Sequence, residues 1–196
     1  MSNNKQNNKR LKSAIAYTDA LIADNSKLNI IRVDLSYDKP YSENITLNDA
    51  NNDFNRMMNN RRSKPSVFKD QEGYICKQEY TESKGIHFHA LFMYDGQKVQ
   101  NSSYKAEQIG KYWEEITGGK GSYHNCHRNE YDPDSNGIGP LDRKDKKKRM
   151  TLEENVLSYL CKEEQTIEPV KNSSKDRAFK RGTIKKDQKK KGRPRS

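Results

Sequence analysis

The alternation of hydrophobic and polar residues divides the chain into short predicted elements. Residues 10–23 place apolar side chains at roughly helical spacing and predict a helix. Residues 28–37 are rich in β-branched and aromatic residues and predict a strand with one polar face in its second half. Residues 46–62 predict another helix. The segments 73–80 and 86–94, separated by the turn TESKG, predict a β-hairpin.

The second half of the chain extends this pattern. Residues 101–117 predict a helix with one apolar face, and 122–128 a short strand. A long loop is expected over 129–149, followed by a helix over 151–160 that begins with a capping box. The order strand, helix, hairpin, helix, strand is the β-α-β-β-α-β plan. We therefore expect an α+β fold, with a ferredoxin-like antiparallel sheet, flanking helices and one further C-terminal helix.

Two histidines share one face of the second hairpin strand. Because side chains alternate along a strand, His87 and His89 point to one side, and Ile86 and Phe88 to the other. Two imidazoles placed in this way can converge on a metal ion. The alternative is a pair of surface histidines on a half-exposed strand.

A third ligand is expected from a neighbouring strand. If the hairpin turns around TESKG, Glu79 lies across from the histidine pair, so its carboxylate is the first choice. Glu82 in the turn and Asp34 on the earlier strand remain alternatives. Two imidazoles and a carboxylate leave coordination positions open for substrate and water. Imidazole favours softer metals and carboxylate favours Mg²⁺ or Mn²⁺, so the ligand types do not fix the identity of the ion. The cofactor we expect is a divalent ion, Mg²⁺ or Mn²⁺.

The C-terminal helix carries a second candidate group. Tyr159 and Lys162 are three residues apart and would project from one helical face, so the lysine would favour the phenolate form of the tyrosine. Lys162 could alternatively orient a metal-bound water or a phosphate. An activated tyrosine is a covalent nucleophile. Alternatively, Tyr159 packs in the core while Lys162 reaches into water.

Charge is concentrated in two short segments. The 196-residue chain has a formal net charge of +11, yet residues 1–142 hold 19 basic and 19 acidic residues. The run 143–149 has six basic residues and one acidic, and 171–196 has 12 basic and two acidic. Such segments bind phosphate backbones without sequence specificity, although they can also be merely solvated. The candidate DNA-binding residues are Lys144, Lys146, Lys147, Lys148, Arg149 and Arg181.

Composition narrows the class of protein further. Only 31% of the residues are hydrophobic and 33% are charged, and the length suits one domain with tails. Three scattered cysteines do not form a disulfide framework, and no secretory signal or membrane span is expected. We expect a reducing, cytoplasmic compartment, a disordered segment over 1–9 and a basic, disordered DNA-binding tail over 171–196.

These motifs together resemble the HUH endonucleases that initiate rolling-circle replication. The match consists of His87-Phe88-His89 followed by Tyr159-Leu160-Cys161-Lys162. The stretches IRVDLSY (31–37), KQEYTESKGIHFHALF (77–92), LSYLCKEEQ (157–165) and AFKRG (178–182) are most similar to inovirus-type replication proteins related to the YagK/YfjJ family. Unlike the two-tyrosine initiators, the chain has Asn155 in the turn that precedes Tyr159.

The resemblance implies a single-tyrosine nicking and joining enzyme over residues 10–170. Tyr159 would attack single-stranded or cruciform origin DNA of a phage or plasmid-like element, leaving a 5′-phosphotyrosine and a free 3′-hydroxyl. The sequence contains no GxxxxGK[ST] loop, so a helicase and replication machinery from the host or the element are expected partners; a dimer is left open. The alternatives are a single-tyrosine transposase and a non-catalytic basic DNA-binding protein.

Overall fold

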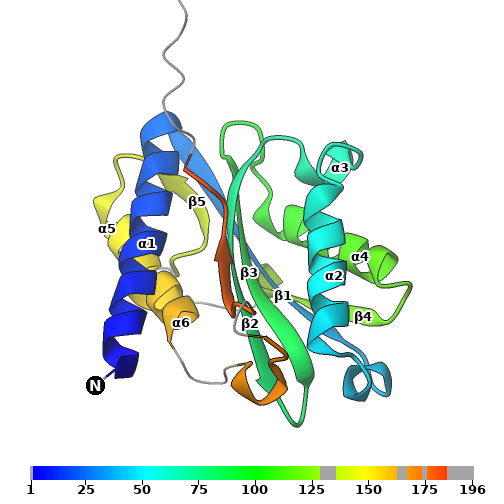
Figure 1. The fold of residues 1–196 in the computed structure, drawn as a ribbon. Coiled ribbons are helices and arrows are strands. Elements are labelled where there is room, and N and C mark those ends of the chain that lie inside the picture. The colour runs from blue at the N-terminus through cyan, green and yellow to red at the C-terminus, as the bar shows by residue number, and fades with distance from the viewer. Residues whose placement is uncertain (1, 129–135, 163–166, 174–175, 185–196) are drawn as a thin grey trace, which may run out of the picture.

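A six-stranded antiparallel sheet forms the centre of the computed structural model, which describes residues 2–128, 136–162, 167–173 and 176–184 (Figure 1). The strands are β1 (Lys27–Tyr37), β2 (Gln71–Thr81), β3 (Gly85–Asp95), β4 (Gly121–Asn125), β5 (Gly139–Asp142) and β6 (Phe179–Arg181). The order is β4-β1-β3-β2-β6, and β5 pairs with the first residues of β1. The predicted α+β fold and its β-α-β-β-α-β order are thus confirmed.

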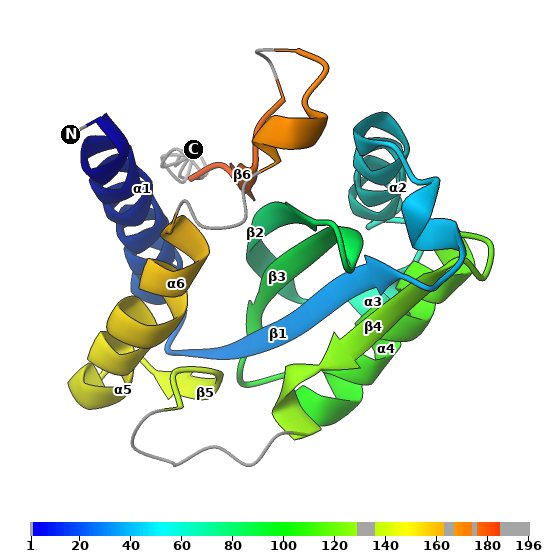
Figure 2. The ribbon, with the colours of Figure 1, turned by 90° about the horizontal axis from the view of Figure 1, so that it is seen from below.

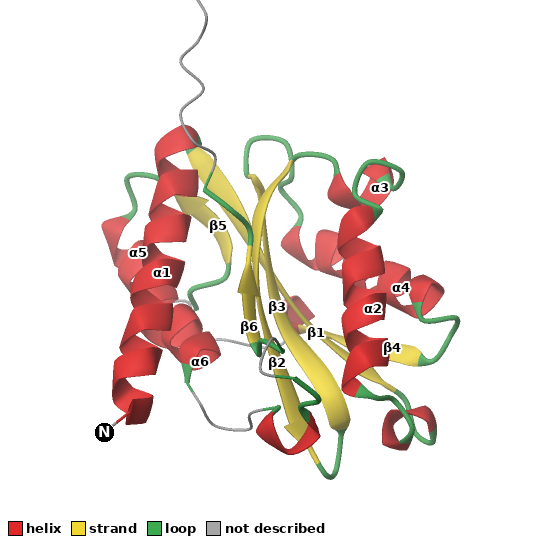
Figure 3. Cartoon of the chain, viewed as in Figure 1, coloured by secondary structure: helices red, strands yellow, loops and turns green. Residues whose placement is uncertain are grey.

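Helices cover both faces of this sheet (Figures 2 and 3). The α-helices are α1 (Ser2–Asp24), α2 (Leu47–Asn59), α3 (Pro65–Phe68), α4 (Ser102–Ile116), α5 (Lys146–Thr151) and α6 (Ser158–Cys161). A π-helical segment, η3 (Leu152–Leu157), joins α5 to α6, and short 3₁₀ turns occupy η1 (Tyr41–Glu43), η2 (Cys126–Arg128) and η4 (Glu168–Val170). Helices α1, α5 and α6 lie on one side of the sheet, and α2, α3 and α4 lie on the other.

Alternation along the strands supplies a separate core for each face. The α2 and α4 side buries Val33, Phe88 and Trp113, and the α1 and α6 side buries Ile30 and Leu91. Burying two apolar layers is what stabilises a three-layer arrangement of this kind. Among the described residues, no helix has the length and apolar character needed to cross a bilayer.

Several expected boundaries differ in the structure. Helix α1 begins at Ser2, although residues 1–9 were expected to be disordered, because extending an existing helix costs far less than starting one. The C-terminal helical run begins at Lys146, where the Asp145 side chain accepts a hydrogen bond from the Lys148 backbone, rather than at Thr151. Most of the basic run expected in a loop is therefore helical.

The predicted disordered tail over 171–196 is wrong for one segment. Residues Phe179–Arg181 form β6 and pair with Ile75–Lys77 of β2. The η4 turn ends at Val170, which packs against the core on the α2 side. Residues 174–175 and 185–196, which hold much of the predicted tail, lie outside the described residues, as does part of the long loop, 129–135.

Candidate metal centre and tyrosine site

The face of the sheet below α1 and α6 changes from apolar to polar along its strands. On β1, Ile30 is followed on the same face by Arg32 and Asp34, and on β2 Ile75 is followed by Lys77 and Glu79. Strand β3 runs the other way, so its polar residues come first. The register pairs His89 with Lys77 and with Asp34, and His87 with Glu79. One polar patch is therefore built from three adjacent strands.

Glu79, His87 and His89 form a compact group at the centre of this patch. One ligand atom from each lies within 4.8 Å of the others. Glu79 Oε2 is 3.4 Å from His87 Nε2 and 3.2 Å from His89 Nε2. All three residues are less than 10% exposed. A buried set of two imidazoles and a carboxylate could hold a divalent metal ion.

The second nitrogen of each imidazole is engaged in a way that suits metal binding. His87 Nδ1 lies 3.1 Å from the Gly85 carbonyl oxygen, and His89 Nδ1 lies 2.8 Å from Asp34 Oδ1. Each contact occupies the Nδ1 side of the ring, so Nε2, the nitrogen that faces Glu79, is the atom available to a metal ion, the arrangement usual for metal-ligating histidines. The donor set therefore fits a metal ion.

The same geometry distinguishes the three acidic candidates for the third ligand. Glu79 belongs to the group, as the first choice from sequence required. Asp34 instead contacts the opposite nitrogen of His89, so it orients this ring. Glu82 is exposed in the turn between β2 and β3. We therefore assign Asp34 a positioning contact and Glu79 the candidate ligand oxygen.

Charge coupling within the group is strong. Burial alone would raise the pKa of Glu79, but hydrogen bonds from His87, His89 and Lys77 lower it far below its usual range. Burial opposes the charged form of His89, yet the carboxylates of Asp34 and Glu79 raise its pKa to about 9. The pKa of Asp34 is lowered by the hydrogen bond to His89 despite burial. Glu79 and Asp34 are thus held ionised.

Tyr159, on α6, lies beside this group although it is 70 residues away from His89 in the sequence. Its hydroxyl lies 3.5 Å from His89 Nε2, and the two rings meet edge to face with centroids 5.5 Å apart. The Leu152–Leu157 π segment immediately precedes the helix that carries Tyr159. Such segments are rare and often occur at functional sites. Tyr159 is 36% exposed, so a substrate can reach it from solvent.

The cations beside Tyr159 are not the one that sequence spacing selected. The Arg32 guanidinium lies 5.1 Å from the centre of the Tyr159 ring, and Lys77 Nζ lies 5.7 Å from it. Lys162 follows the last helical residue, has extended backbone (φ −64°, ψ 149°) and is exposed. Its backbone N–H donates to the Tyr159 carbonyl, but among the described residues no hydrogen bond or ion pair joins its side chain to the site. The (i, i+3) prediction for Lys162 requires a helix that has already ended.

The environment of the phenol does not favour ionisation in the structure as it stands. Burial and the charges of Glu79 and Asp34 raise the pKa of Tyr159, and Arg32 partly offsets them. Arg32, Lys77 and Asp34 all share the strand face of the histidines. This alternation was the sequence signal that could have identified Arg32 and Lys77, because each lies two residues before a candidate acid.

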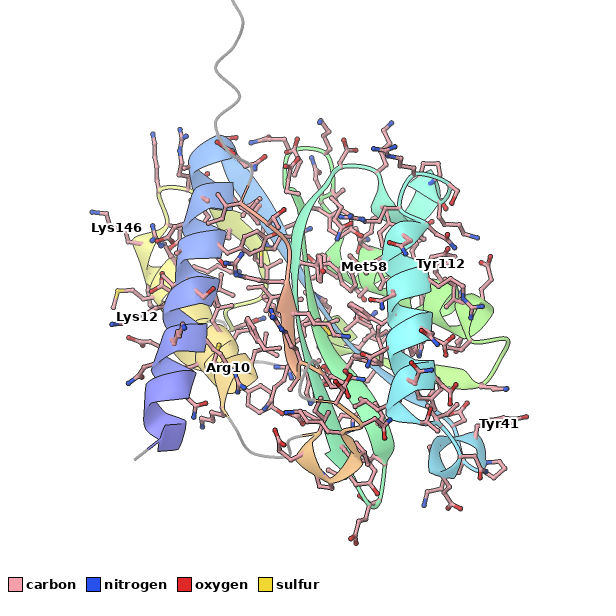
Figure 4. All side chains as sticks on the ribbon, viewed as in Figure 1. Arg10, Lys12, Tyr41, Met58, Tyr112 and Lys146 are labelled. Carbon is pink, nitrogen blue, oxygen red and sulfur yellow. The ribbon has the colours of Figure 1, made fainter. Side chains whose placement is uncertain are left out.

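The candidate DNA-binding residues differ in exposure and in their partners within the chain. Lys144, Lys146 and Lys147 are exposed, and Lys12 and Lys146 point outward from the α1 and α5 layer (Figure 4). Lys148 is partly buried, which lowers its pKa. The other two are engaged within the chain: Arg149 pairs with Asp19 and Glu153, and Arg181 donates to Ser13 Oγ and lies over the Tyr17 ring.

His127 performs a structural task near the site. Its Nε2 accepts a hydrogen bond from the Arg32 backbone N–H at 3.1 Å. Arg32 lies between the part of β1 that pairs with β5 and the part that pairs with β4. Burial and the charge of Lys148 lower the pKa of His127 to about 4. Neutral His127 thus supplies a hydrogen-bond acceptor to the edge of β1 at a position that neither β4 nor β5 covers.

We expect a measurable pH dependence of stability from His127. Its pKa rises from about 4 in the folded chain to 6.5 when unfolded, so the unfolded state binds more protons between these values. The stabilisation is complete above pH 6.5 and is lost as the pH falls toward 4, by up to about 3 kcal/mol. Urea unfolding of His127→Gln should show less acid sensitivity than wild type over this window.

The exposed His124 provides the control for this experiment. A His124→Gln variant removes an exposed imidazole from β4 and leaves the bond between His127 and the Arg32 backbone in place, so its unfolding should follow the wild-type pH dependence. Equal acid sensitivity of His127→Gln and wild type would contradict the role given to His127.

Comparison with known proteins gives one match. The sequence model of the YagK/YfjJ C-terminal domain matches residues 1–181, which include every residue of the metal group and Tyr159. No curated protein and no solved structure matches the chain.

Proposed function

Since the chain belongs to the YagK/YfjJ C-terminal domain family, we propose that it is a metal-dependent HUH endonuclease that nicks and joins single-stranded DNA through Tyr159. One observation carries the proposal. The Tyr159 hydroxyl lies 3.5 Å from His89 Nε2, at a buried group of two histidines and a glutamate, although 70 residues separate the two in sequence. A nucleophile beside a candidate metal group is the arrangement that tyrosine-dependent DNA cleavage requires.

The chain's own residues would divide the work as follows. Glu79, His87 and His89 would hold Mg²⁺ or Mn²⁺, and Asp34 and the Gly85 carbonyl would keep the imidazoles oriented. The bound ion would polarise the scissile phosphodiester and fix its position.

Tyr159 would then attack phosphorus. Its oxygen forms the new P–O bond, the P–O3′ bond breaks, the phenolic proton is released, and the departing 3′-oxygen takes up a proton. The products are a 5′-phosphotyrosine and a free 3′-hydroxyl. Because the tyrosyl ester retains the energy of the broken diester, rejoining needs no nucleotide cofactor.

The biological setting we propose is the initiation of rolling-circle replication of a phage or plasmid-like element in a bacterial cytoplasm. The free 3′-hydroxyl would serve as a primer, and a helicase from the host or the element would unwind the DNA. The exposed lysines on and before α5, Lys144, Lys146 and Lys147, would contribute salt-sensitive backbone contacts.

The proposal is tested by searching for the covalent intermediate. The full chain is incubated with Mn²⁺ and single-stranded DNA from its element's replication origin, labelled at the 3′ end because the strand 3′ of the nick stays on the tyrosine, and transfer of label to protein is followed on denaturing gels. We expect a labelled protein band that EDTA abolishes and that excess acceptor strand with a 3′-hydroxyl reverses. Metal-independent DNA binding without any labelled protein would favour a non-catalytic DNA-binding protein instead.

A further inference from the structure

Two cationic side chains, those of Lys77 and Arg32, lie beside the candidate metal group, although a site that only binds a metal ion does not need them. Lys77 is only 4% exposed, and its Nζ lies 2.5 Å from Glu79 Oε1. Arg32 Nε lies 3.5 Å from Asp34 Oδ1, two residues further along β1. A cation this close to a ligand carboxylate competes with a metal ion for its charge. The presence of Lys77 and Arg32 therefore needs an explanation other than affinity for the metal ion.

The net charge of the site explains why the two cations are present. With both histidines neutral, as metal binding requires, the negative charges of Asp34 and Glu79 balance the positive charges of Arg32 and Lys77. A divalent ion then brings two uncompensated positive charges. One phosphodiester and one phenolate carry two negative charges together. The loaded site is thus matched to both anions at once, whereas without Arg32 and Lys77 it would match neither.

The positions of Arg32 and Lys77 also suit a site that holds two anions. Arg32 and Lys77 approach the Tyr159 ring at 5.1 Å and 5.7 Å from its centre, from β1 and β2 respectively. Because β3 lies between these strands and carries His89, the two cations approach the nucleophile from either side of this histidine. An anion that joins Tyr159 to the metal group would lie between them.

We propose that Arg32 and Lys77 form a cationic pair that binds the scissile DNA phosphodiester and the oxygen of Tyr159 during attack, the task that sequence spacing had given to Lys162. This inference rests on the proposed function and names the residues that allow two anions to meet in one buried site. Fixed charges aimed at developing negative charge are among the largest contributions to enzymatic rate.

The test uses effects of opposite sign on metal binding and on catalysis. In Lys77→Met and Arg32→Met, the chain length is largely kept and one positive charge is removed. We expect Mn²⁺ affinity, measured by calorimetry, to stay equal or to increase by up to ~10-fold, because a repelling charge is gone. The rate of covalent adduct formation should fall by ~10²-fold or more in each variant.

Two further variants serve as controls. Lys105→Met removes another buried lysine, which bonds to the Ser66 and Val67 carbonyls on the α2 and α4 side, and should change neither Mn²⁺ affinity nor adduct rate. Arg32→Lys keeps the charge without the planar guanidinium and should recover part of the rate. Arg32 is partly exposed, so its variants test the inference if Lys77→Met does not fold.

The outcomes separate this inference from the proposed function. Folded Lys77→Met and Arg32→Met variants that lose Mn²⁺ affinity more than tenfold, or that form adduct at the wild-type rate, would overturn the cationic pair and leave the nuclease intact. If the wild-type protein forms no adduct, the nuclease proposal fails. The Mn²⁺ affinities then still decide whether the two cations oppose metal binding, as the inference requires.

Discussion

Tyr159→Phe should abolish the covalent protein–DNA adduct while leaving metal binding unchanged. The substitution removes only the hydroxyl that lies 3.5 Å from His89 Nε2 and keeps the ring that contacts His89 and Arg32. Loss of a covalent nucleophile lowers rates by several orders of magnitude, and we expect at least ~10³-fold here. Label transfer from end-labelled origin DNA measures the rate, and Mn²⁺ calorimetry verifies the intact metal group.

Tyr104 offers a matched control for this prediction. It is 61% exposed on α4, on the opposite side of the sheet, so Tyr104→Phe should form adduct at the wild-type rate. An adduct of undiminished amount in Tyr159→Phe would assign the nucleophile to another residue. Loss of Mn²⁺ binding in the same variant would show that the hydroxyl supports the metal group, and the kinetic loss would then have a different cause.

The metal group could be predicted from the sequence because its three residues are related by strand alternation and by the register of one hairpin. Strand alternation places His87 and His89 on one face and Phe88 on the other, and a tight hairpin fixes the register that brings Glu79 opposite His87. Each of these relations spans few residues. The structure confirms the fold and the convergence of these three side chains, whereas the reaction itself stays a prediction.

Strand alternation places Arg32 and Lys77 on the face of the histidines, but it does not show that they lie beside Tyr159. Lys162 was selected by helical spacing, but the helix ends at Cys161 and the extended backbone of the next residue breaks that spacing. Arg32 and Lys77 reach the tyrosine only because α6 packs across two strands that are distant in sequence. A charged residue on a strand is usually solvated, so its burial under a distant helix cannot be inferred from local pattern.

The short strand β6 escaped prediction for a related reason. Phe179–Arg181 contributes three residues within a strongly basic segment, and its composition is typical of a disordered tail. It is ordered because the free edge of β2 supplies backbone partners and because Arg181 can lie over Tyr17 and bond to Ser13. Arg181, chosen as a DNA contact from its charge, therefore joins β6 to α1.

His89→Ala should remove Mn²⁺ binding and, with it, the stabilisation that the metal confers. His89 supplies one of three candidate ligand atoms, and its loss leaves two ligands that cannot hold the ion firmly. A ligand that binds only the folded state stabilises it by about 2.7 kcal/mol at one hundred times its dissociation constant. We therefore expect thermal unfolding of the wild-type protein, but not of His89→Ala, to shift upward with Mn²⁺.

The exposed His124 again supplies the matched comparison, because β4 places it opposite Asp34 but outside the metal group. His124→Ala should keep the wild-type response to Mn²⁺, which excludes a general effect of losing an imidazole. In EDTA, His89→Ala also leaves Asp34 and Glu79 without the imidazole between them, so its stability without metal sets the baseline. An unchanged Mn²⁺-induced shift in His89→Ala would place the metal elsewhere, and the role of Tyr159 beside it would fall with that result.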